Sequence, residues 1–394
     1  MNATSFKRRD GPAGMPKRKL KICHVTSAHR RTSSRIFDKF CVSAAERGHE
    51  VVYLVADGQE DETRQDVRIV GSHKPKGRWH RFFVTPRKLL ALAKRIDADV
   101  YQLHDPELLT IAASLRAKGR VVVFDFHEDL PVQVLQKEYL KFGTSRVLSV
   151  LLKAYQLWVA RRINGVICAT RFISNKFVAS GIRSIPVMNF PRLEVFNTSQ
   201  SWASRANNVV YVGAISPQRG ITEVVKALEH TTSDVRLRLA GAFDSEDYHR
   251  YLMTLAGWQK VDYLGFLSKE QVVHEISLAK VGMVTLHPLQ NYIDAMPIKL
   301  FEYMSLGTPV VSSDFPVWRE IVEGAECGKV VNPLSPEEIA DAIDVIVSDD
   351  PAARQMGLNG SQRVRDLYNW KAEEAKVMVF YEELLFDDMS HAPG

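Results

Sequence analysis

Two carboxylates eight residues apart, Asp294 and Glu302, bracket the segment of this chain with the most specific chemical pattern. Between them lies Pro297, and proline is favoured in the first turn of a helix. We therefore expect a helix over about residues 296–306, ended by Gly307. Asp294 would lie just outside the start of that helix and Glu302 about a turn and a half inside it. Both carboxylates would then be available to bind sugar or ribose hydroxyls.

The N-terminus of this expected helix is also a candidate anion site. The backbone amides of Ile298 and Lys299 would have no carbonyl partner within the helix and would point outward, where the helix dipole favours negative charge. The alternative is an ordinary amphipathic helix with an N-terminal aspartate. That alternative is less favoured because Glu302 lies among apolar residues, and a buried carboxylate needs partners.

A second candidate follows the strand expected over residues 208–212. The chain continues through Gly213 and a short turn to Arg219, just before a helix expected over residues 221–228. An arginine at a helix N-terminus suits a diphosphate, because the guanidinium and the helix amides act together. The segment is neither a GxGxxG fingerprint nor a P-loop, and a plain surface arginine is the alternative.

In the front half of the chain, His104 directly follows a strand expected over residues 99–103. Ligands of parallel α/β sheets bind at such strand ends. An imidazole at that position donates or accepts a hydrogen bond near neutral pH. The following Asp105-Pro-Glu is equally typical of a capped helix start, in which case the histidine is incidental.

Three further polar residues, Asp125, His127 and Glu128, come at the end of the next strand, expected over residues 120–126. They would form one wall of the same cleft, on the side of an acceptor substrate. Their types would suit a metal, but their spacing lacks a supporting ligand, so we predict no metal site. A polar loop with a helix cap is an equally weighted alternative.

All of these candidates lie at ends of expected strands, in a chain where strand and helix patterns alternate. Such alternation indicates α/β architecture with parallel sheets. An amphipathic helix over Arg35–Arg47, ended by Gly48, separates the first two strands. The expected strands cover residues 19–26, 50–56, 99–103, 120–126, 165–169 and 185–188 in the front half, and 208–212, 235–240, 261–265, 282–286 and 308–312 in the back half.

A polar run over residues 197–208 marks a linker between two α/β domains of similar size. The crevice between two such halves is where a ligand is expected. We predict a disordered basic arm at residues 1–18, an N-terminal Rossmann-like domain at 19–195, a C-terminal Rossmann-like domain at 205–370, and a helix and tail at 371–394 that pack back toward the N-terminal domain.

Charge is unevenly distributed along the 394 residues, whose net charge is +6. Residues 1–200 hold 35 basic and 18 acidic side chains, and the remainder holds 17 basic and 28 acidic side chains. A basic front half favours contact with an anionic surface, with a merely solvated surface as the alternative. Four scattered cysteines fit a reducing cytosol, and neither an apolar run of about 20 residues nor a signal-peptide core is present.

On these residues the chain resembles the large family 4 of retaining nucleotide-sugar glycosyltransferases, bacterial envelope-glycan enzymes with the GT-B fold. The similarity runs over essentially the whole chain and is most specific in PIKLFEYMSLGTPVVSSDFP, which resembles that family's donor-site helix. The resemblance implies two Rossmann-like domains with parallel sheets that face each other across a cleft. The N-terminal domain would bind the acceptor and the C-terminal domain the donor.

The resemblance also implies roles for single residues. His104 matches a histidine that contacts the donor sugar, and Arg219 matches the basic residue that binds the diphosphate. Glu302 would bind the ribose. Asp294, where the family usually has glutamate, would contact the sugar hydroxyls. His104, Arg219 and Asp294 are therefore expected to act in catalysis, and Gly213, Phe266, Leu267, Ile298 and Lys299 to line the donor site with Arg219, Asp294 and Glu302.

Two departures from the family pattern stand out. Ala214 replaces a second basic residue that usually follows the glycine, which would shift more of the phosphate charge onto Arg219 and Lys299. The glycine pair usual after the first strand is missing, and residues 29–35 stand there instead. The run Leu264-Gly-Phe-Leu267 keeps its resemblance to the segment that packs against the nucleotide base.

The implied activity is that of a retaining, metal-independent hexosyltransferase that works without a cofactor. Its donor would be a nucleotide-sugar, with UDP favoured by family habit, and its acceptor a lipid-linked or envelope-polysaccharide glycan. Two alternatives remain: a UDP-sugar epimerase of the same fold, and a catalytically inactive nucleotide-sugar-binding protein. No recognisable nucleic-acid-binding motif is present, so nucleic acid is not expected as a partner.

Basic and aromatic side chains interleave at residues 74–83 and 137–162. Segments of this composition lie in anionic membrane interfaces. Our hypothesis is a cytoplasmic enzyme that binds peripherally to the inner face of the cytoplasmic membrane. The alternative, of equal weight, is that these apolar residues pack the core of the N-terminal domain.

Overall fold

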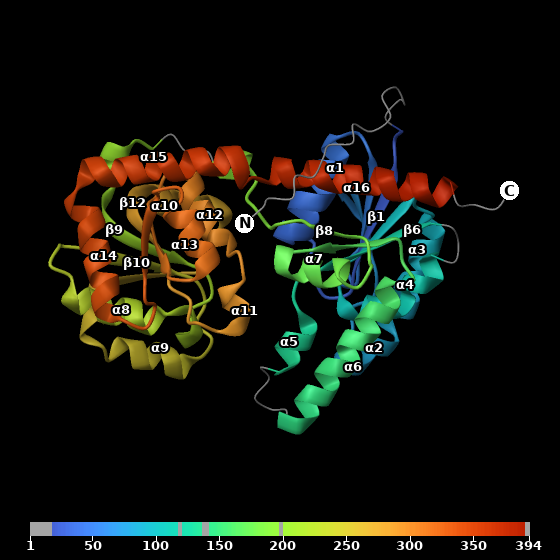
Figure 1. The fold of residues 1–394 in the computed structure, drawn as a ribbon, viewed down its shortest axis with the longest axis horizontal. Coiled ribbons are helices and arrows are strands. Elements are labelled where there is room, and N and C mark those ends of the chain that lie inside the picture. The colour runs from blue at the N-terminus through green and yellow to red at the C-terminus, as the bar shows by residue number, and fades with distance from the viewer. Residues whose placement is uncertain (1–17, 117–119, 136–141, 197–199, 391–394) are drawn as a thin grey trace. The chain divides into compact units, whose positions relative to one another are not determined.

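The computed structural model describes residues 18–116, 120–135, 142–196 and 200–390 (Figure 1). The predicted disordered arm, apart from Arg18, lies outside these residues. The chain divides into two compact units. One contains the described residues of Met1–Asp125, Val159–Gly165 and Leu384–Gly394, and the other those of Phe126–Trp158 and Val166–Glu383.

The first sheet has eight strands in the order β3-β4-β2-β1-β5-β6-β7-β8. Its inner strands are buried along most of their length because helices cover both faces of a parallel sheet. All pairs recorded residue by residue are parallel except β3 with β4, which is antiparallel. The strands are β1 (Lys21–Thr26), β2 (Glu50–Val55), β3 (Glu62–Arg64), β4 (Val67–Gly71), β5 (Val100–Leu103), β6 (Val121–Phe126), β7 (Gly165–Cys168) and β8 (Ser184–Pro186).

The second sheet has six parallel strands in the order β11-β10-β9-β12-β13-β14. Side chains of β9 alternate between two cores. Tyr211 packs with residues of α8 and α14 on one face, and Val210 packs with residues of α10, α12 and α13 on the other. The strands are β9 (Ala206–Val212), β10 (Arg236–Ala240), β11 (Val261–Gly265), β12 (Ala279–Val284), β13 (Val310–Ser313) and β14 (Gly328–Val331).

Helices connect the strands of each sheet, as parallel topology requires. Those up to the last strand of the first sheet are η1 (Ser34–Cys41), α1 (Val42–Glu46), α2 (Arg78–Phe83), α3 (Thr85–Ile96), η2 (Pro106–Leu108), α4 (Leu109–Arg116), α5 (Leu130–Leu135), α6 (Phe142–Ala160) and α7 (Arg171–Val178). The later ones are η3 (Leu193–Phe196), η4 (Trp202–Ser204), η5 (Pro217–Arg219), α8 (Ile221–His230), α9 (Glu246–Met253), η6 (Ala256–Lys260), α10 (Lys269–Leu278), α11 (Gln290–Ile293), α12 (Ile298–Ser305), α13 (Pro316–Val322), α14 (Pro336–Ser348), α15 (Asp350–Leu367) and α16 (Trp370–Ser390).

The expected helix over residues 35–47 is the element whose type differs most from the prediction. Its first part, η1, is a π-helix, and only Val42–Glu46 is α-helical. A π-helical stretch turns side chains out of their α-helical positions and often occurs at functional sites. Here it carries Arg35, which forms an ion pair with Asp125 on β6.

The strand predictions missed β3, β4 and β14 and placed β12 too late in the chain. β3 and β4 form a hairpin whose turn holds Gln65 and Asp66 at positive φ, without the glycine or asparagine that normally announces such a turn. β12 begins at Ala279, directly after α10, so no loop residues mark its start. In the part of the chain that the structure describes, no helix has the length and apolarity needed to cross a bilayer.

Candidate functional site

The carboxyl ends of three neighbouring strands, β9, β10 and β11, each carry a glycine at positive φ. Gly213 has φ +137°, Gly241 +143° and Gly265 +68°. A Cβ on Gly241 would lie only 1.8 Å from the backbone oxygen of Gly213. The absence of side chains lets the ends of β9 and β10 pack closely on each other and on Lys299, and only at Gly265 is the space around the backbone open. Of the three, only Gly213 was predicted from the sequence as a site residue.

Lys299, in the first turn of α12, lies directly beside this edge. Lys299 is 7 % exposed, and its Nζ is 3.8 Å from the centre of the Tyr211 ring. A Cβ on Gly213 would be 2.9 Å from the same Nζ. No described group accepts a hydrogen bond from this amine. Burial, helped by the nearby Arg219 charge and opposed by Glu302, lowers the pKa of Lys299 well below its ordinary value.

This buried amine predicts a pH-dependent stability. The folded protein binds the Lys299 proton less tightly than the unfolded chain, so the free energy of unfolding should rise with pH up to the ordinary lysine pKa of about 10.4. One proton contributes at most about 1.4 kcal/mol per pH unit. We expect the Lys299→Met variant to lose that rise in urea unfolding between about pH 7 and 9. An unchanged slope in the variant would contradict a lowered pKa.

Helix α12 starts two residues later than expected, at Ile298. Pro297 has ψ 126°, which is an extended conformation, so it precedes the helix as its cap and is not part of the first turn. The first amides, those of Ile298 and Lys299, lack carbonyls one turn earlier, as predicted. The helix is fixed on the sheet by Tyr303, whose hydroxyl accepts a hydrogen bond from the Val212 amide at 3.1 Å.

The two carboxylates of the donor segment lie on different elements. Asp294 caps the carboxyl end of α11 and is half-buried. Glu302 lies in the second turn of α12, also half-buried and close enough to Lys299 to favour its charged form. The structure therefore brings Glu302, Lys299 and Gly213 toward one strand end, and it places Asp294 on the segment that leads into α12.

Arg219 ends the η5 turn between β9 and α8 and is half-buried. It acts electrostatically on both Tyr211 and Lys299. Burial raises the pKa of the Tyr211 hydroxyl, with Arg219 opposing it. The turn is held in place by His287, whose amide donates to the Gln218 carbonyl at 3.0 Å. Arg219 thus lies on the same side of the β9 end as Lys299, as the diphosphate prediction requires.

Phe266, which follows β11, is 87 % exposed, and Leu267 beside it is half-buried. Exposing the aromatic side chain of Phe266 to solvent next to Gly265 is unfavourable in free energy. In this position the ring is available to stack on a flat ligand. Its place at the end of β11, two strands from β9, agrees with the predicted nucleotide-base segment.

In the other unit, His104 follows β5 as predicted, but its ring is enclosed. Its Nδ1 is 3.1 Å from Asp125, and its Nε2 is 3.1 Å from Nδ1 of His24. Because a carboxylate only accepts, His104 donates from Nδ1 and its Nε2 accepts from His24. His104 is 2 % exposed, and burial lowers the pKa of His24 well below its ordinary value.

Asp125 lies within β6 and has no exposed side-chain surface, so it forms no open wall of a cleft. Arg35 binds it through two nitrogens, at 3.0 and 2.7 Å. A guanidinium at that distance also disfavours a metal ion on Asp125 and His104. Of the other predicted acceptor residues, His127 is half-buried and Glu128 is exposed. Any effect of Asp125 on a substrate therefore passes through Arg35 or His104.

Asp105 lies at the N-cap of η2, as expected, but its carboxylate fixes the loop after β1 and does not cap the helix. Its carboxylate accepts from the Thr26 hydroxyl at 2.6 Å, from the Ser27 amide at 2.7 Å, and pairs with His29 at 3.0 Å. Burial opposes ionisation, but these hydrogen bonds prevail and lower the pKa of Asp105. The neighbouring Glu107 accepts from Ser27 at 2.5 Å and from Arg81 on α2. The loop that lacks the usual glycines is thus held by buried carboxylates.

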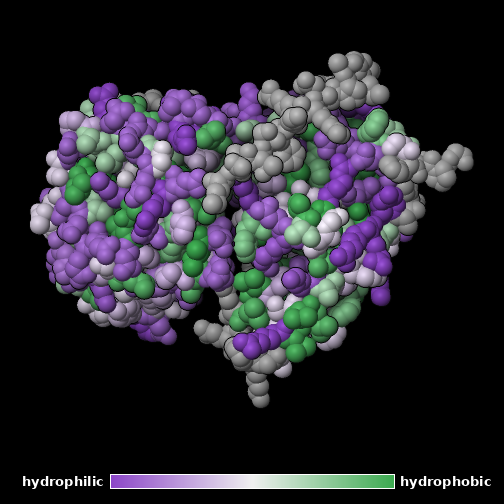
Figure 2. Space-filling view, viewed as in Figure 1, coloured by the Kyte–Doolittle hydropathy of each residue, from purple (hydrophilic) through white to green (hydrophobic). Residues whose placement is uncertain are grey.

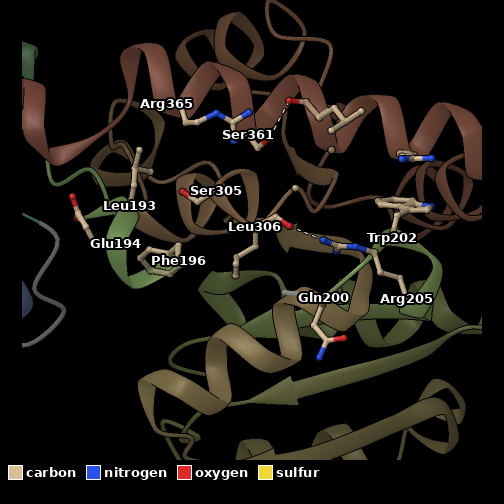
Figure 3. A pocket seen from close by; sticks show the side chains of 14 residues that line it. Leu193, Glu194, Phe196, Gln200, Trp202, Arg205, Ser305, Leu306, Ser361 and Arg365 are labelled. Carbon is tan, nitrogen blue, oxygen red and sulfur yellow. Dashed lines mark hydrogen bonds between the residues drawn. The ribbon is translucent and has the colours of Figure 1, made fainter. Parts of the chain in front are cut away.

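A cavity of about 640 Å³ lies at the other end of α12 (Figure 3). None of the predicted site residues lines it. Arg205 reaches from the chain before β9 and donates to the Leu306 carbonyl at 2.6 Å and to the Thr308 hydroxyl at 2.7 Å. The cavity is lined by Leu193, Glu194, Phe196, Gln200, Trp202, Arg205, Ser305, Leu306, Gly307, Arg354, Gly357, Leu358, Ser361 and Arg365.

Comparison with known proteins agrees with this geometry. Residues 33–189 match the family described as Glycosyltransferase Family 4, and residues 196–363 match Glycosyl transferases group 1. The chain therefore belongs to the family 4 glycosyltransferases with the GT-B fold, and it is a transferase.

Among curated proteins, the chain is 23% identical over 294 residues to a phosphatidyl-myo-inositol mannosyltransferase of Mycobacterium leprae, covering 73% of this chain and 74% of that protein. It is 24% identical over 180 residues to the alpha-D-kanosaminyltransferase of Streptomyces kanamyceticus, covering 45% of each.

Among solved structures, sucrose-phosphate synthase from Thermosynechococcus elongatus aligns with a TM-score of 0.76 at 16% identity, over 94% of this chain and 100% of that one. Anabaena HepE in complex with UDP aligns with a TM-score of 0.67 at 17% identity, over 92% of this chain and 100% of that one. Two parallel-sheet domains of the GT-B type are thereby confirmed.

Proposed function

We propose that this glycosyltransferase moves a sugar from a UDP-sugar to a lipid-linked or envelope-polysaccharide acceptor, with retention of anomeric configuration and without a metal. The observation that carries the proposal is the end of β9, where Gly213 lies beside the Lys299 amine and the Arg219 guanidinium is close to that amine. UDP as the nucleotide is supported by UDP-bound structural neighbours such as Anabaena HepE.

In this proposal the diphosphate lies over Gly213. It is bound by Arg219, by Lys299 and by the first amides of α12, a set of donors suited to an anion. The UDP leaving group gains negative charge as its bond to the sugar breaks, so these groups stabilise the transition state more than the ground state. Ile298 contributes the first of the amides.

The remaining roles follow from the same placement. Glu302 binds the ribose hydroxyls, and Asp294, on the approach to α12, binds hydroxyls of the donor sugar. Phe266 and Leu267 hold the uracil base. His104 contacts the donor sugar, as the family resemblance implies. Because its Nε2 accepts from His24 in the empty protein, we propose that a sugar hydroxyl replaces His24 as that partner.

A panel of UDP- and GDP-sugars tests the proposal. We expect release of UDP that depends on an added lipid-linked or polysaccharide acceptor, and a product linkage, read by NMR, with the anomeric configuration of the donor. An epimerase would convert the UDP-sugar without releasing nucleotide. An inactive binding protein would bind the nucleotide-sugar and do neither. Either of those two results would overturn the proposal.

A lipid-linked acceptor is supported by the exposed face of α6. Val147, Val150, Leu151 and Trp158 recur at helical spacing on this helix, and each has at least half of its surface exposed. Residues 142–162 contain no acidic side chain, and the basic ones stand among these apolar residues. Figure 2 shows apolar side chains gathered along α6. A basic helix with an exposed apolar stripe is suited to an anionic membrane interface.

A smaller surface of the same kind lies on α2. Trp79 is 80 % exposed, and Phe82 and Phe83 are about half exposed, so they do not pack a core. Arg81 fixes this helix to Glu107, beside the loop after β1. We therefore propose a cytoplasmic enzyme that binds the inner face of the cytoplasmic membrane through α6 and α2.

Replacing Leu151 and Trp158 together with glutamate is expected to weaken binding to anionic vesicles at least about tenfold, because burial of either side chain contributes about 1.5–3 kcal/mol. Co-sedimentation with vesicles rich in phosphatidylglycerol measures the effect. The matched control is Val345→Glu on α14, a half-exposed valine outside both surfaces. Equal binding by the double variant and the control, or wild-type binding that does not weaken with salt, would contradict the membrane proposal.

A further inference from the structure

The proposed donor site contains one cation less than its family pattern on the turn after β9, where Ala214 stands. Lys299 approaches that turn from α12 instead, with its Nζ 2.9 Å from the point where a Gly213 side chain would begin. A second positive charge near this turn would therefore come from another element. The Lys299 amine is buried, whereas a basic side chain on the turn after β9 would be exposed to solvent.

Among the described residues the amine has no hydrogen-bond acceptor. From β9, the face of the Tyr211 ring lies 3.8 Å from Nζ and favours an ammonium through a cation–π contact, whereas from η5 the Arg219 guanidinium repels a second positive charge. From its own helix, Glu302 is the one group that favours the charge. The Tyr303 hydroxyl already accepts from the Val212 amide. An ammonium ion held here without water or an acceptor carries a large desolvation cost.

A bound diphosphate would reverse that balance. Its oxygens would bring negative charge close to the buried amine, and this favours the ammonium form. We infer that the Lys299 amine is uncharged while the donor site is empty and takes up one proton from solvent when a nucleotide diphosphate binds. The inference rests on the proposed function. No covalent bond to the ligand forms, and the proton passes from water or buffer to Nζ.

Linkage then sets the pH dependence of donor binding. Where the empty site has lost the Lys299 proton and the occupied site holds it, binding takes up about one proton, and the association constant falls up to about tenfold for each pH unit. Below the pH at which the empty site itself is protonated, this dependence disappears. The enzyme would therefore lose donor affinity on the alkaline side while its fold gains stability there.

Isothermal titration of the full chain with UDP measures the proton directly. At about pH 8, UDP is fully ionised because its terminal phosphate has a pKa of about 6. Comparing phosphate and Tris buffers, which differ in ionisation enthalpy, yields the number of protons exchanged. We expect about one proton taken up per UDP by the wild type and none by Lys299→Met. Lys299→Arg should bind UDP without proton uptake, because arginine is always charged.

The outcomes separate this inference from the proposed function. UDP binding by the wild type without proton uptake would overturn the inference and leave the donor site standing, as would uptake that persists in Lys299→Met. If the wild type binds neither UDP nor GDP, the proposed function fails and the inference fails with it. Thermal unfolding shows whether each variant folds. If Lys299→Met does not fold, Lys299→Arg decides the assignment.

Discussion

Replacing Arg219 with alanine is expected to reduce turnover about 100- to 1000-fold, the effect of removing one preorganised donor to a developing negative charge. Arg219 is half-buried at the N-terminal side of α8 and lies near Tyr211 and Lys299. Its loss leaves Lys299 as the remaining side-chain cation proposed to bind the phosphates. The measurement is acceptor-dependent UDP release with the donor that the panel identifies.

The matched control is Arg250→Ala on α9. This arginine forms only an exposed pair with Asp247, so its loss should leave turnover within about twofold, as expected for a surface pair. Turnover of Arg219→Ala that equals that of the control would remove Arg219 from the proposed mechanism. Full turnover with weaker donor affinity would make it a binding residue only.

Replacing Gly241 with alanine is expected to destabilise the fold by about 2–5 kcal/mol and to abolish donor binding. The new Cβ would lie 1.8 Å from the Gly213 oxygen, so the β9 turn must move, and φ +143° is itself unfavourable for alanine. Urea unfolding and UDP titration measure the two effects.

The Gly307→Ala variant distinguishes the effect of backbone strain from that of a steric clash. Gly307 also has a positive φ, +66°, but its Cβ would meet nothing closer than 3.6 Å. We expect a loss of about 1–2 kcal/mol from backbone strain alone, with donor binding retained. If Gly241→Ala is no more harmful than Gly307→Ala, close packing of the β9 and β10 ends is not what shapes the site.

Most of the fold followed from local patterns. Largely apolar runs predicted β1, β2 and β5 almost to the residue, because parallel strands are buried on both faces. The bounds predicted for β11, which ends at Gly265, are those of the structure. The π-helix was not predictable, since its apolar pattern over eight residues is too short to be distinguished from that of an α-helix. Its geometry depends on Arg35 reaching a partner 90 residues later in the chain.

The site was predictable where it depends on local sequence and not where it depends on contacts between distant segments. Gly213, Arg219, Lys299 and Glu302 were predicted as site residues because each lies near the end of an expected strand or helix. The contact between the Tyr211 ring and the Lys299 amine could not be predicted. The two residues are on different elements and meet only after the sheet forms. The partners of His104 were missed for the same reason. In the sequence, His24 resembles an ordinary core residue of β1. Its neighbours in the chain do not indicate that it forms a hydrogen bond with His104.

Arg205 makes the electrostatic potentials at the two ends of α12 unequal. Helix α12 has eight residues, so its two ends are only about 12 Å apart, and the partial negative charge at its carboxyl end weakens the positive potential at its amino end. Arg205 donates to the carbonyl of Leu306, the cap of that end, and carries a full positive charge, because burial lowers its pKa only to about 10. The negative pole is thereby neutralised. An anion at the start of α12 then experiences an almost isolated positive charge, whose field falls off more slowly than that of a dipole.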